Sequence, residues 1–184
     1  HITSDSSIKN IGILFDESYF KDKQAVINEL IKNGVNKQNI HFLVFRDKIK
    51  KNETFDYSVF SYKDISWSGT FDKTEVNQFV NNNFDLLINY YDTENAALIL
   101  ATNLSKASFK VGFASVDNRL NHFLIDTHAE NYLVFMNELI KYLKILGLST
   151  VSALTYQNDV ISLIADDSNV LYEYNTKYDE LNKI

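Results

Sequence analysis

The chain has 184 residues, of which 45% are hydrophobic and 14% aromatic, which suits one globular domain with a small appendage. Its formal charge of −6 excludes the basic surface that nucleic acids or anionic lipids attract, and no apolar run is long enough to cross a bilayer. The absence of cysteine excludes disulfides and thiolate metal sites and fits a reducing compartment, so we expect a cytoplasmic protein.

The first part of the chain alternates apolar runs with an amphipathic segment. Residues 10–16 (NIGILFD) and 39–47 (NIHFLVFRD) are typical of buried strands. Between them, Ser18 is in position to cap a helix that ends at Gly34. A strand–helix–strand unit of this kind predicts parallel pairing of its two strands.

A third strand with less regular alternation is predicted at residues 57–67 (YSVFSYKDISW). After it, Asp72 and Glu75 have the spacing of a capping box, which predicts a helix from about residue 73 to the asparagines at 81–83. The large aromatic side chains of this region suit either the core or a pocket or interface; they are Phe60, Tyr62 and Trp67.

The most apolar strand is predicted at residues 84–91 (FDLLINYY), and Asp92 or Thr93 is in position to cap the helix that follows. Two further strands are predicted at 109–115 and 122–127. Thr127 and Glu130 then have the spacing of a second capping box, ahead of a long helix that ends at Gly147.

This alternation predicts an α/β fold, a Rossmann-like three-layer sandwich with a largely parallel sheet. Beyond it, the runs TVSALTY, DVISLIA and NVLYEYN are separated by short polar turns, which predicts an antiparallel β meander. We therefore expect a Rossmann-like domain over residues 1–147 and a β-meander appendage over residues 148–184.

Ligands of open α/β sheets bind beyond the carboxyl ends of the strands, where the strand order reverses. The candidate catalytic residues are therefore the acids at predicted strand ends, Asp16, Asp92 and Asp117. The neighbouring candidates for ligand binding are Glu17, Ser18, Glu94 and Arg119. Two interpretations stay open: the acids serve as acid, base or Mg²⁺ ligands, or they cap the helices that follow. We assign no metal site.

The first strand–helix turn reads FDESYF, which contains no glycine and has two acids that would repel a phosphate. The sequence therefore excludes a standard dinucleotide or P-loop site at this turn, and we expect no cofactor. A second polar group lies in NHFLIDTH, where Asp126 and His128 suit either a general base or the polar face of an edge strand, and His122 lies on the same face.

Residues 84–113, FDLLINYY followed by AALILATNLSKASFKVGF, resemble the N-terminal half of heptosyltransferase-type glycosyltransferases of the GT-B fold. The resemblance implies an acceptor-side domain. The chain departs from that family in its first turn, where Asp16, Glu17 and Ser18 replace a glycine-bearing sequence, and in having no second Rossmann half. We therefore transfer no donor-binding residue.

Over residues 8–146 the chain is more similar to an uncharacterised bacterial α/β family of unknown function, through IGILFDESYF, SYKDISWSGTF, LLINYYD and KVGFASVDNRLNHFLID. Residues 152–184 resemble the opening blade of a β-propeller.

Two functions follow as hypotheses. The first is a non-catalytic binding or interaction module for an unknown small molecule or protein. The alternative is a diverged or partial glycosyltransferase domain that uses Asp16, Asp92 and Asp117, with Arg119 as an anion contact; whether the protein is an enzyme stays open.

Overall fold

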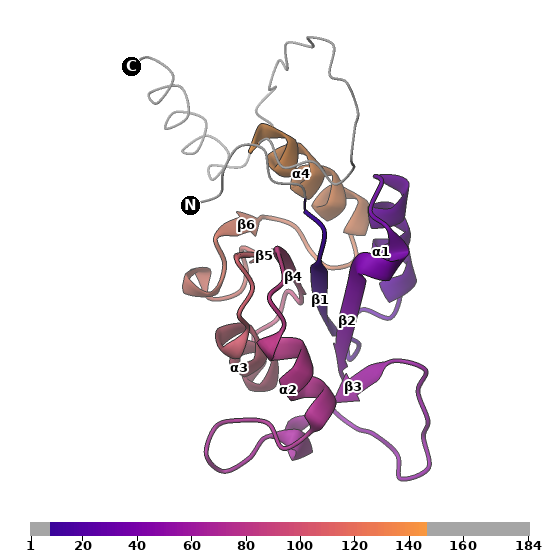
Figure 1. Ribbon diagram of the computed structural model, residues 1–184, viewed down its shortest axis with the longest axis vertical. Coiled ribbons are helices and arrows are strands. Elements are labelled where there is room, and N and C mark those ends of the chain that lie inside the picture. The colour runs from indigo at the N-terminus through magenta and orange to yellow at the C-terminus, as the bar shows by residue number, and fades with distance from the viewer. Residues whose placement is uncertain (1–7, 147–184) are drawn as a thin grey trace. The chain divides into compact units, whose positions relative to one another are not determined.

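The computed structural model describes residues 8–146, which form an α/β fold around one all-parallel sheet (Figure 1). The six strands lie in the order β3-β2-β1-β4-β5-β6. This is the doubly wound order, in which the chain passes from one side of β1 to the other between β3 and β4. The strands are β1 (Ile11–Asp16), β2 (Ile40–Phe45), β3 (Ser58–Phe60), β4 (Leu86–Tyr90), β5 (Phe109–Phe113) and β6 (Phe123–Ile125).

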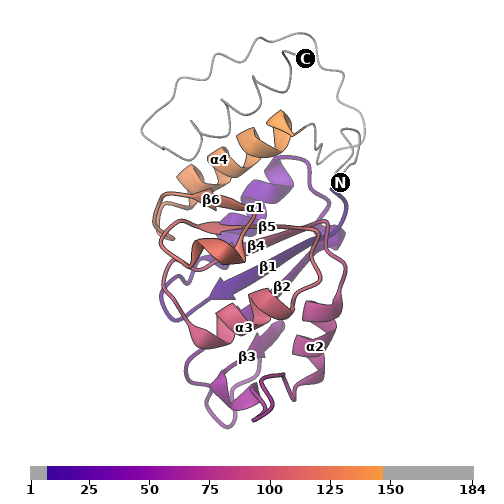
Figure 2. The ribbon, with the colours of Figure 1, turned by 90° about the vertical axis from the view of Figure 1, so that its left-hand side faces the viewer.

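Helices cover both faces of the sheet (Figure 2). One face carries α1 (Lys23–Lys32) and α4 (Tyr132–Ile145), and the other carries α2 (Thr74–Asn81) and α3 (Ala96–Leu104). The predicted α/β class and parallel sheet are confirmed. The predicted β meander and the domain boundary at residue 147 lie outside the described residues. No helix within residues 8–146 is long and apolar enough to cross a membrane.

The two central strands are buried along their whole length, because a sheet covered on both faces has no solvent-facing side. On the face of α1 and α4, the ring of Tyr90 contacts four other rings, those of Phe15, Phe20, Phe113 and Phe135, at centroid distances of 5.0 to 5.6 Å. On the opposite face, Leu14 and Leu87 join the core beneath α2 and α3. The apolar runs seen in the sequence therefore supply both layers of the core.

Close packing at β1 requires a glycine. A Cβ atom at Gly12 would lie 2.7 Å from the ring of Phe84, which is fully buried and packs on Phe79 at a centroid distance of 4.9 Å. Contacts this short force a ring or the backbone to move. Gly12 thus leaves room on β1 for the ring of Phe84, which lies two residues before β4.

A chain of buried polar side chains joins β4 to α3. The Asn89 amide nitrogen donates to Asn121 Oδ1 at 2.7 Å, and the Thr102 hydroxyl donates to Asn89 Oδ1 at 3.0 Å. The hydroxyls of Tyr91 and Thr102 lie 2.7 Å apart, and burial raises the pKa of Tyr91 to about 12. Gly112 makes room for this arrangement, since a Cβ there would lie 2.5 Å from the Asn121 amide nitrogen. We call these side chains the Asn89 network; each side chain in it has a hydrogen-bond partner.

The predicted helix caps are wrong at several places. Ser18 does not cap α1, which begins at Lys23 after Asp22, whose carboxylate accepts from the Ala25 N–H at 3.1 Å. The reason is Phe20, which is buried against Tyr90 and so holds the intervening residues in a loop. Tertiary packing of one aromatic ring thus overrides the local start signal.

Three other caps also differ from prediction. Asn95 caps α3 in place of Asp92 or Thr93, by accepting from the N–H groups of Ala97 and Leu98. The predicted capping boxes at Asp72–Glu75 and Thr127–Glu130 are absent from the described structure, because α2 begins at Thr74 after Lys73 and α4 begins at Tyr132 after Asn131. Polar residues crowd each helix start, so spacing alone does not identify the one that caps.

The predicted strand at residues 57–67 is mostly turn. Only Ser58–Phe60 pairs in the sheet, and Ser61 and Asp64 then form a capping box around a 3₁₀ turn. Phe60 belongs to the core, Tyr62 is 45% exposed and Trp67 is fully exposed. Of the three aromatic side chains, only Phe60 is therefore core.

Candidate functional site

The strand order reverses between β1 and β4, so the edge beyond their carboxyl ends is where an α/β sheet binds ligands. Asp16 is the last residue of β1, and Asp92 follows β4 by two residues. The structure therefore brings these two predicted site residues to the two sides of the reversal point. We call this region the β1–β4 edge.

Asp16 is buried, with 3% of its surface exposed. Its Oδ1 atom accepts a hydrogen bond from the Ser18 N–H at 2.9 Å, and its carbonyl oxygen accepts from the Phe20 N–H at 3.2 Å. Its Oδ2 atom is also buried but has no hydrogen-bond partner within residues 8–146. We call this atom the unpaired oxygen of Asp16. The turn that follows β1 supplies a hydrogen-bond donor only to the other carboxylate oxygen, Oδ1.

The electrostatic surroundings of Asp16 are unfavourable for its charged form. Burial raises the pKa of the carboxyl group, and hydrogen bonding from Ser18 opposes that rise. The negative charges of Asp92 and Asp47 raise the pKa further. Asp47 is exposed and lies two residues after β2, so the acids at both neighbouring strand ends act on Asp16.

Two tyrosine residues lie near the end of β1. Tyr62 packs edge-on against Phe45, at a centroid distance of 5.1 Å, and Phe45 is the register neighbour of Asp16 on β2. Burial raises the pKa of Tyr62, with smaller effects from Asp47, Asp16 and Tyr19. Tyr19 is 70% exposed. The β1–β4 edge thus combines a buried carboxylate with two solvent-accessible aromatic rings.

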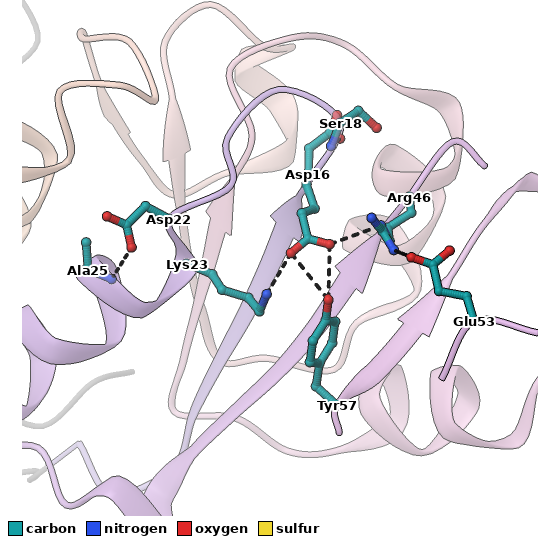
Figure 3. A network of polar contacts seen from close by, with 9 residues as sticks. Asp16, Ser18, Asp22, Lys23, Ala25, Arg46, Glu53 and Tyr57 are labelled. Carbon is teal, nitrogen blue, oxygen red and sulfur yellow. Dashed lines mark hydrogen bonds and ion pairs between the residues drawn. The ribbon is translucent and has the colours of Figure 1, made fainter. Parts of the chain in front are cut away.

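Glu17, the neighbour of Asp16, has a different environment, and its partners Lys23, Arg46 and Tyr57 are labelled in Figure 3. Its carboxylate accepts from Lys23 Nζ at 2.6 Å and from the Tyr57 hydroxyl at 3.1 Å, and lies 3.1 Å from Arg46 Nε. Its side chain is 11% exposed. We call these four side chains the Glu17 network; it ties β1, α1, the end of β2 and the loop before β3 together.

The two cations of this network, Lys23 and Arg46, are each paired with an acid of the protein. Arg46 also binds Glu53, and its guanidinium lies 5.0 Å from the centroid of the Phe55 ring. Lys23 Nζ lies 4.1 Å from the centroid of the Tyr57 ring. Burial acts to lower the pKa of Lys23, but the hydrogen bond and charge of Glu17 outweigh it and the pKa is raised. Neither cation is therefore available to an anionic ligand.

Asp92 fastens a distant loop. Its Oδ2 atom accepts from the Ala129 N–H at 2.8 Å, while the buried Tyr90 hydroxyl donates to the Ala129 carbonyl at 2.6 Å. The Ser115 hydroxyl donates to the Asp92 carbonyl at 2.7 Å, and His128 Nδ1 lies 4.0 Å from the carboxylate. Asp92 thus holds the segment between β6 and α4 against the end of β4.

Asp117 and Arg119 pair with each other. The Asp117 carboxylate accepts from the N–H of Arg119 at 3.0 Å and from its guanidinium, and these hydrogen bonds lower the pKa of Asp117 to about 2. The Arg119 side chain is 85% exposed. Both residues lie on a turn after β5, where their charges are matched locally. Ser18 and Glu94 are exposed, and they follow the carboxyl ends of β1 and β4 respectively.

The polar side chains of NHFLIDTH make separate contacts and do not form one site. His122 Nδ1 accepts from the Lys110 N–H at 2.9 Å, and its ring stacks on Phe109. Asp126 is exposed, and His128 approaches Asp92 as described above. Among the residues that the structure describes, no three His, Cys, Asp or Glu side chains are grouped so as to hold a metal ion.

Residues 1–146 match DUF6913, a family of unknown function. The chain belongs to this family. The match confirms the expectation that most of the chain belongs to a family of unknown function, while the likeness to glycosyltransferases and to a propeller blade stays a prediction. Comparison with curated proteins gives no match.

Three residues of the β1–β4 edge in this DUF6913 chain were not predicted as site residues from the sequence: Asp47, Tyr62 and Tyr19. Asp47 follows a strand just as Asp16 does, so the strand-end rule could have identified it. Tyr62 was noted only as an aromatic residue, and Tyr19 stands in the FDESYF turn without a distinguishing pattern. The proximity of Asp47 and Tyr62 to Asp16 depends on the strand order, which local sequence patterns did not predict.

Proposed function

We propose that the domain is a non-catalytic binding module whose ligand site is the β1–β4 edge. The observation that carries the proposal is the unpaired oxygen of Asp16. Nearly all buried polar atoms of native proteins have a hydrogen-bond partner, and a buried charge without one is strongly destabilising. A ligand that donates a hydrogen bond to this oxygen would account for the retention of an acid at this position.

The binding role is favoured over catalysis because three of the other acids at strand ends, Glu17, Asp92 and Asp117, are engaged. General acid–base or two-carboxylate chemistry needs at least two groups in reach of the same substrate. Glu17 is held by three partners, Asp92 accepts from Ala129, and Asp117 is paired with Arg119. One carboxylate oxygen without a partner suits recognition of a ligand better than turnover of a substrate.

The glycosyltransferase-like alternative needs Asp16, Asp92 and Asp117 to act on one substrate. The pairing of Asp117 with Arg119 does not favour this arrangement. A nucleotide sugar would also bring phosphate charge to an edge where Asp16, Asp47 and Asp92 already repel one another. Binding of UDP-glucose to this edge is therefore the result that would support the alternative.

The test is a nuclear magnetic resonance titration of the full chain with three probes at millimolar concentration: spermidine, glucose and UDP-glucose. We expect spermidine or glucose to shift the backbone signals of Asp16 and Tyr19 in the native protein and to lose this effect in Asp16→Asn. An Asp16-dependent response to UDP-glucose alone would support the glycosyltransferase-like alternative instead. Asp126→Asn is the matched control, because Asp126 is an exposed acid that directly follows β6. If no probe perturbs this edge, the proposed function is overturned.

A further inference from the structure

Resting on the proposed function, we infer that the ligand carries an organic cation, an alkylammonium or guanidinium group, bound by the Asp16 carboxylate between the rings of Tyr19 and Tyr62. This inference names the chemical class of the ligand that the proposed site would bind. It follows from the charge around Asp16, from the two rings beside it and from the donors that each class of ligand can offer.

The charge at the β1–β4 edge selects for a cation. The leading charges that act on Asp16 are those of Asp92 and Asp47, both negative. The nearby cations, Lys23 and Arg46, are held by the Glu17 network. A cationic group at this edge would therefore relieve repulsion among three carboxylates, whereas an anionic ligand would add to it.

The unpaired oxygen gives the cation a specific contact. An N–H group of an ammonium or guanidinium donates a charge-assisted hydrogen bond to a carboxylate, which is stronger than a bond between neutral groups. Because Ser18 already occupies Oδ1, such a ligand would complete the hydrogen bonding of the carboxylate at Oδ2.

The two rings suit the same class of ligand. Ammonium and guanidinium groups are attracted to the faces of aromatic rings, and this attraction grows where water is excluded. Tyr62 is 45% exposed and is anchored on Phe45, while Tyr19 is 70% exposed on the loop between β1 and α1. Since the unpaired oxygen has no solvent contact, the ligand must displace the side chain that covers it, and Tyr19, three residues along the chain from Asp16, is 70% exposed.

Other ligand classes fit less well. Phosphate groups lack the glycine-rich turn that would bring backbone N–H groups to them, and the acids repel them. A divalent metal prefers several oxygen ligands, and the described residues do not group three acidic or histidine side chains around one point. A neutral sugar donates hydrogen bonds but leaves the repulsion among the acids unrelieved.

The experiment is a titration of the full chain with N-butylguanidinium and its neutral isostere N-butylurea, followed by the signals of Asp16, Tyr19 and Tyr62. We expect N-butylguanidinium to bind at least about tenfold more tightly than N-butylurea, because only the former makes a charge-assisted bond. Asp16→Asn should weaken guanidinium binding by about tenfold or more. Tyr19→Ala should weaken it several-fold and Tyr19→Phe should restore it, because Phe keeps the ring face.

The controls separate this inference from general charge effects and from the proposed function. Asp126→Asn changes the net charge as Asp16→Asn does; if both weaken binding equally, only charge screening is at work and the inference is overturned. Equal affinity for N-butylurea, or a stronger Asp16-dependent response to MgCl₂, also overturns it. If glucose instead gives the Asp16-dependent response, the cation class is wrong but the binding module stands. If UDP-glucose gives it, the glycosyltransferase-like alternative is favoured over both. If none of these probes perturbs the edge, the cation class and the proposed binding module are both overturned.

Discussion

Two buried polar regions of this protein, the Asn89 network and the β1–β4 edge, lie on neighbouring central strands and treat their polar atoms differently. In the Asn89 network, the Thr102 hydroxyl hydrogen-bonds both Tyr91 and Asn89, and Asn89 donates to Asn121. At the β1–β4 edge, the buried Asp16 carboxylate has one oxygen without a partner within residues 8–146. The polar groups of the Asn89 network are thus satisfied by the fold, and the unpaired oxygen of Asp16 is the exception on which the proposed binding site rests.

The Glu17 network sharpens this contrast, because Glu17 is the direct neighbour of Asp16. A second carboxylate at the end of β1 is surrounded by two cations and a hydroxyl. The fold therefore supplies partners for both oxygens of Glu17 and, within the described part of the chain, leaves one oxygen of Asp16 without a partner.

The largest expected effect comes from breaking the satisfied region. Thr102→Val keeps the shape of the side chain but leaves Asn89 Oδ1 and the Tyr91 hydroxyl each short of a partner. We expect the free energy of unfolding to fall by about 3 kcal/mol, measured by urea denaturation followed by circular dichroism. Thr93→Val, at an exposed position, is the control and should change it by less than about 0.5 kcal/mol. A Thr102→Val protein as stable as the native one would contradict the structural role of the network.

Removing the charge of Glu17 should have the next largest effect. Glu17→Gln leaves Lys23 and Arg46 without their shared counter-charge while both are mostly buried. We expect a loss of about 2 kcal/mol, less than for a fully buried pair because water still reaches the cations. Glu29→Gln, which breaks a pair with the exposed Lys32, should be close to neutral in the same urea titration. A similar loss in both variants would contradict the structural role of the Glu17 network.

Asp16→Asn should do the opposite and stabilise the protein at pH 7, by about 1 kcal/mol, as is common when an unfavourable functional site is relieved. The pKa of Asp16 is raised in the folded state above its ordinary value near 3.8, so the folded protein binds this proton more tightly than the unfolded chain. The native protein therefore gains stability from Asp16 as the pH falls through the raised pKa. The advantage of Asp16→Asn should accordingly be present at pH 7 and shrink as the pH approaches 3.8. A loss of stability at pH 7 would show that the carboxylate serves the fold.

The smallest effect is expected at Arg119. Arg119→Ala removes an exposed partner of Asp117, so the urea midpoint should not change measurably. The pKa of Asp117, which Arg119 lowers to about 2, should rise toward 3.8 in this variant, as read from the pH dependence of its carboxyl signal in nuclear magnetic resonance. An unchanged pKa would mean that the pair does not form in solution.

Much of the fold was predictable because buried parallel strands leave apolar runs in the sequence. All six strands lie within or beside the predicted runs, although only three residues of 57–67 pair in the sheet. The helix starts were less predictable, because several residues near each start can cap and the choice depends on tertiary contacts. At α1, the burial of Phe20 moved the cap from Ser18 to Asp22.

The candidate site was predictable only as a location. The rule that ligands bind beyond strand ends pointed to Asp16 and Glu17 alike. What separates them is that Lys23, Arg46 and Tyr57, from three different segments, converge on Glu17 and not on Asp16. Such convergence is a property of the folded chain, and no local spacing encodes it.

The turn that carries Trp67 has a practical consequence for all of these measurements. Trp67 is the only tryptophan of the chain and is fully exposed, so its emission in the folded protein is already that of an indole in water. Unfolding would barely shift that emission, which is why circular dichroism is the better probe of stability here. A shift of the emission to shorter wavelength would instead report that another molecule had covered this turn, which makes the residue a built-in fluorescent sensor for partners.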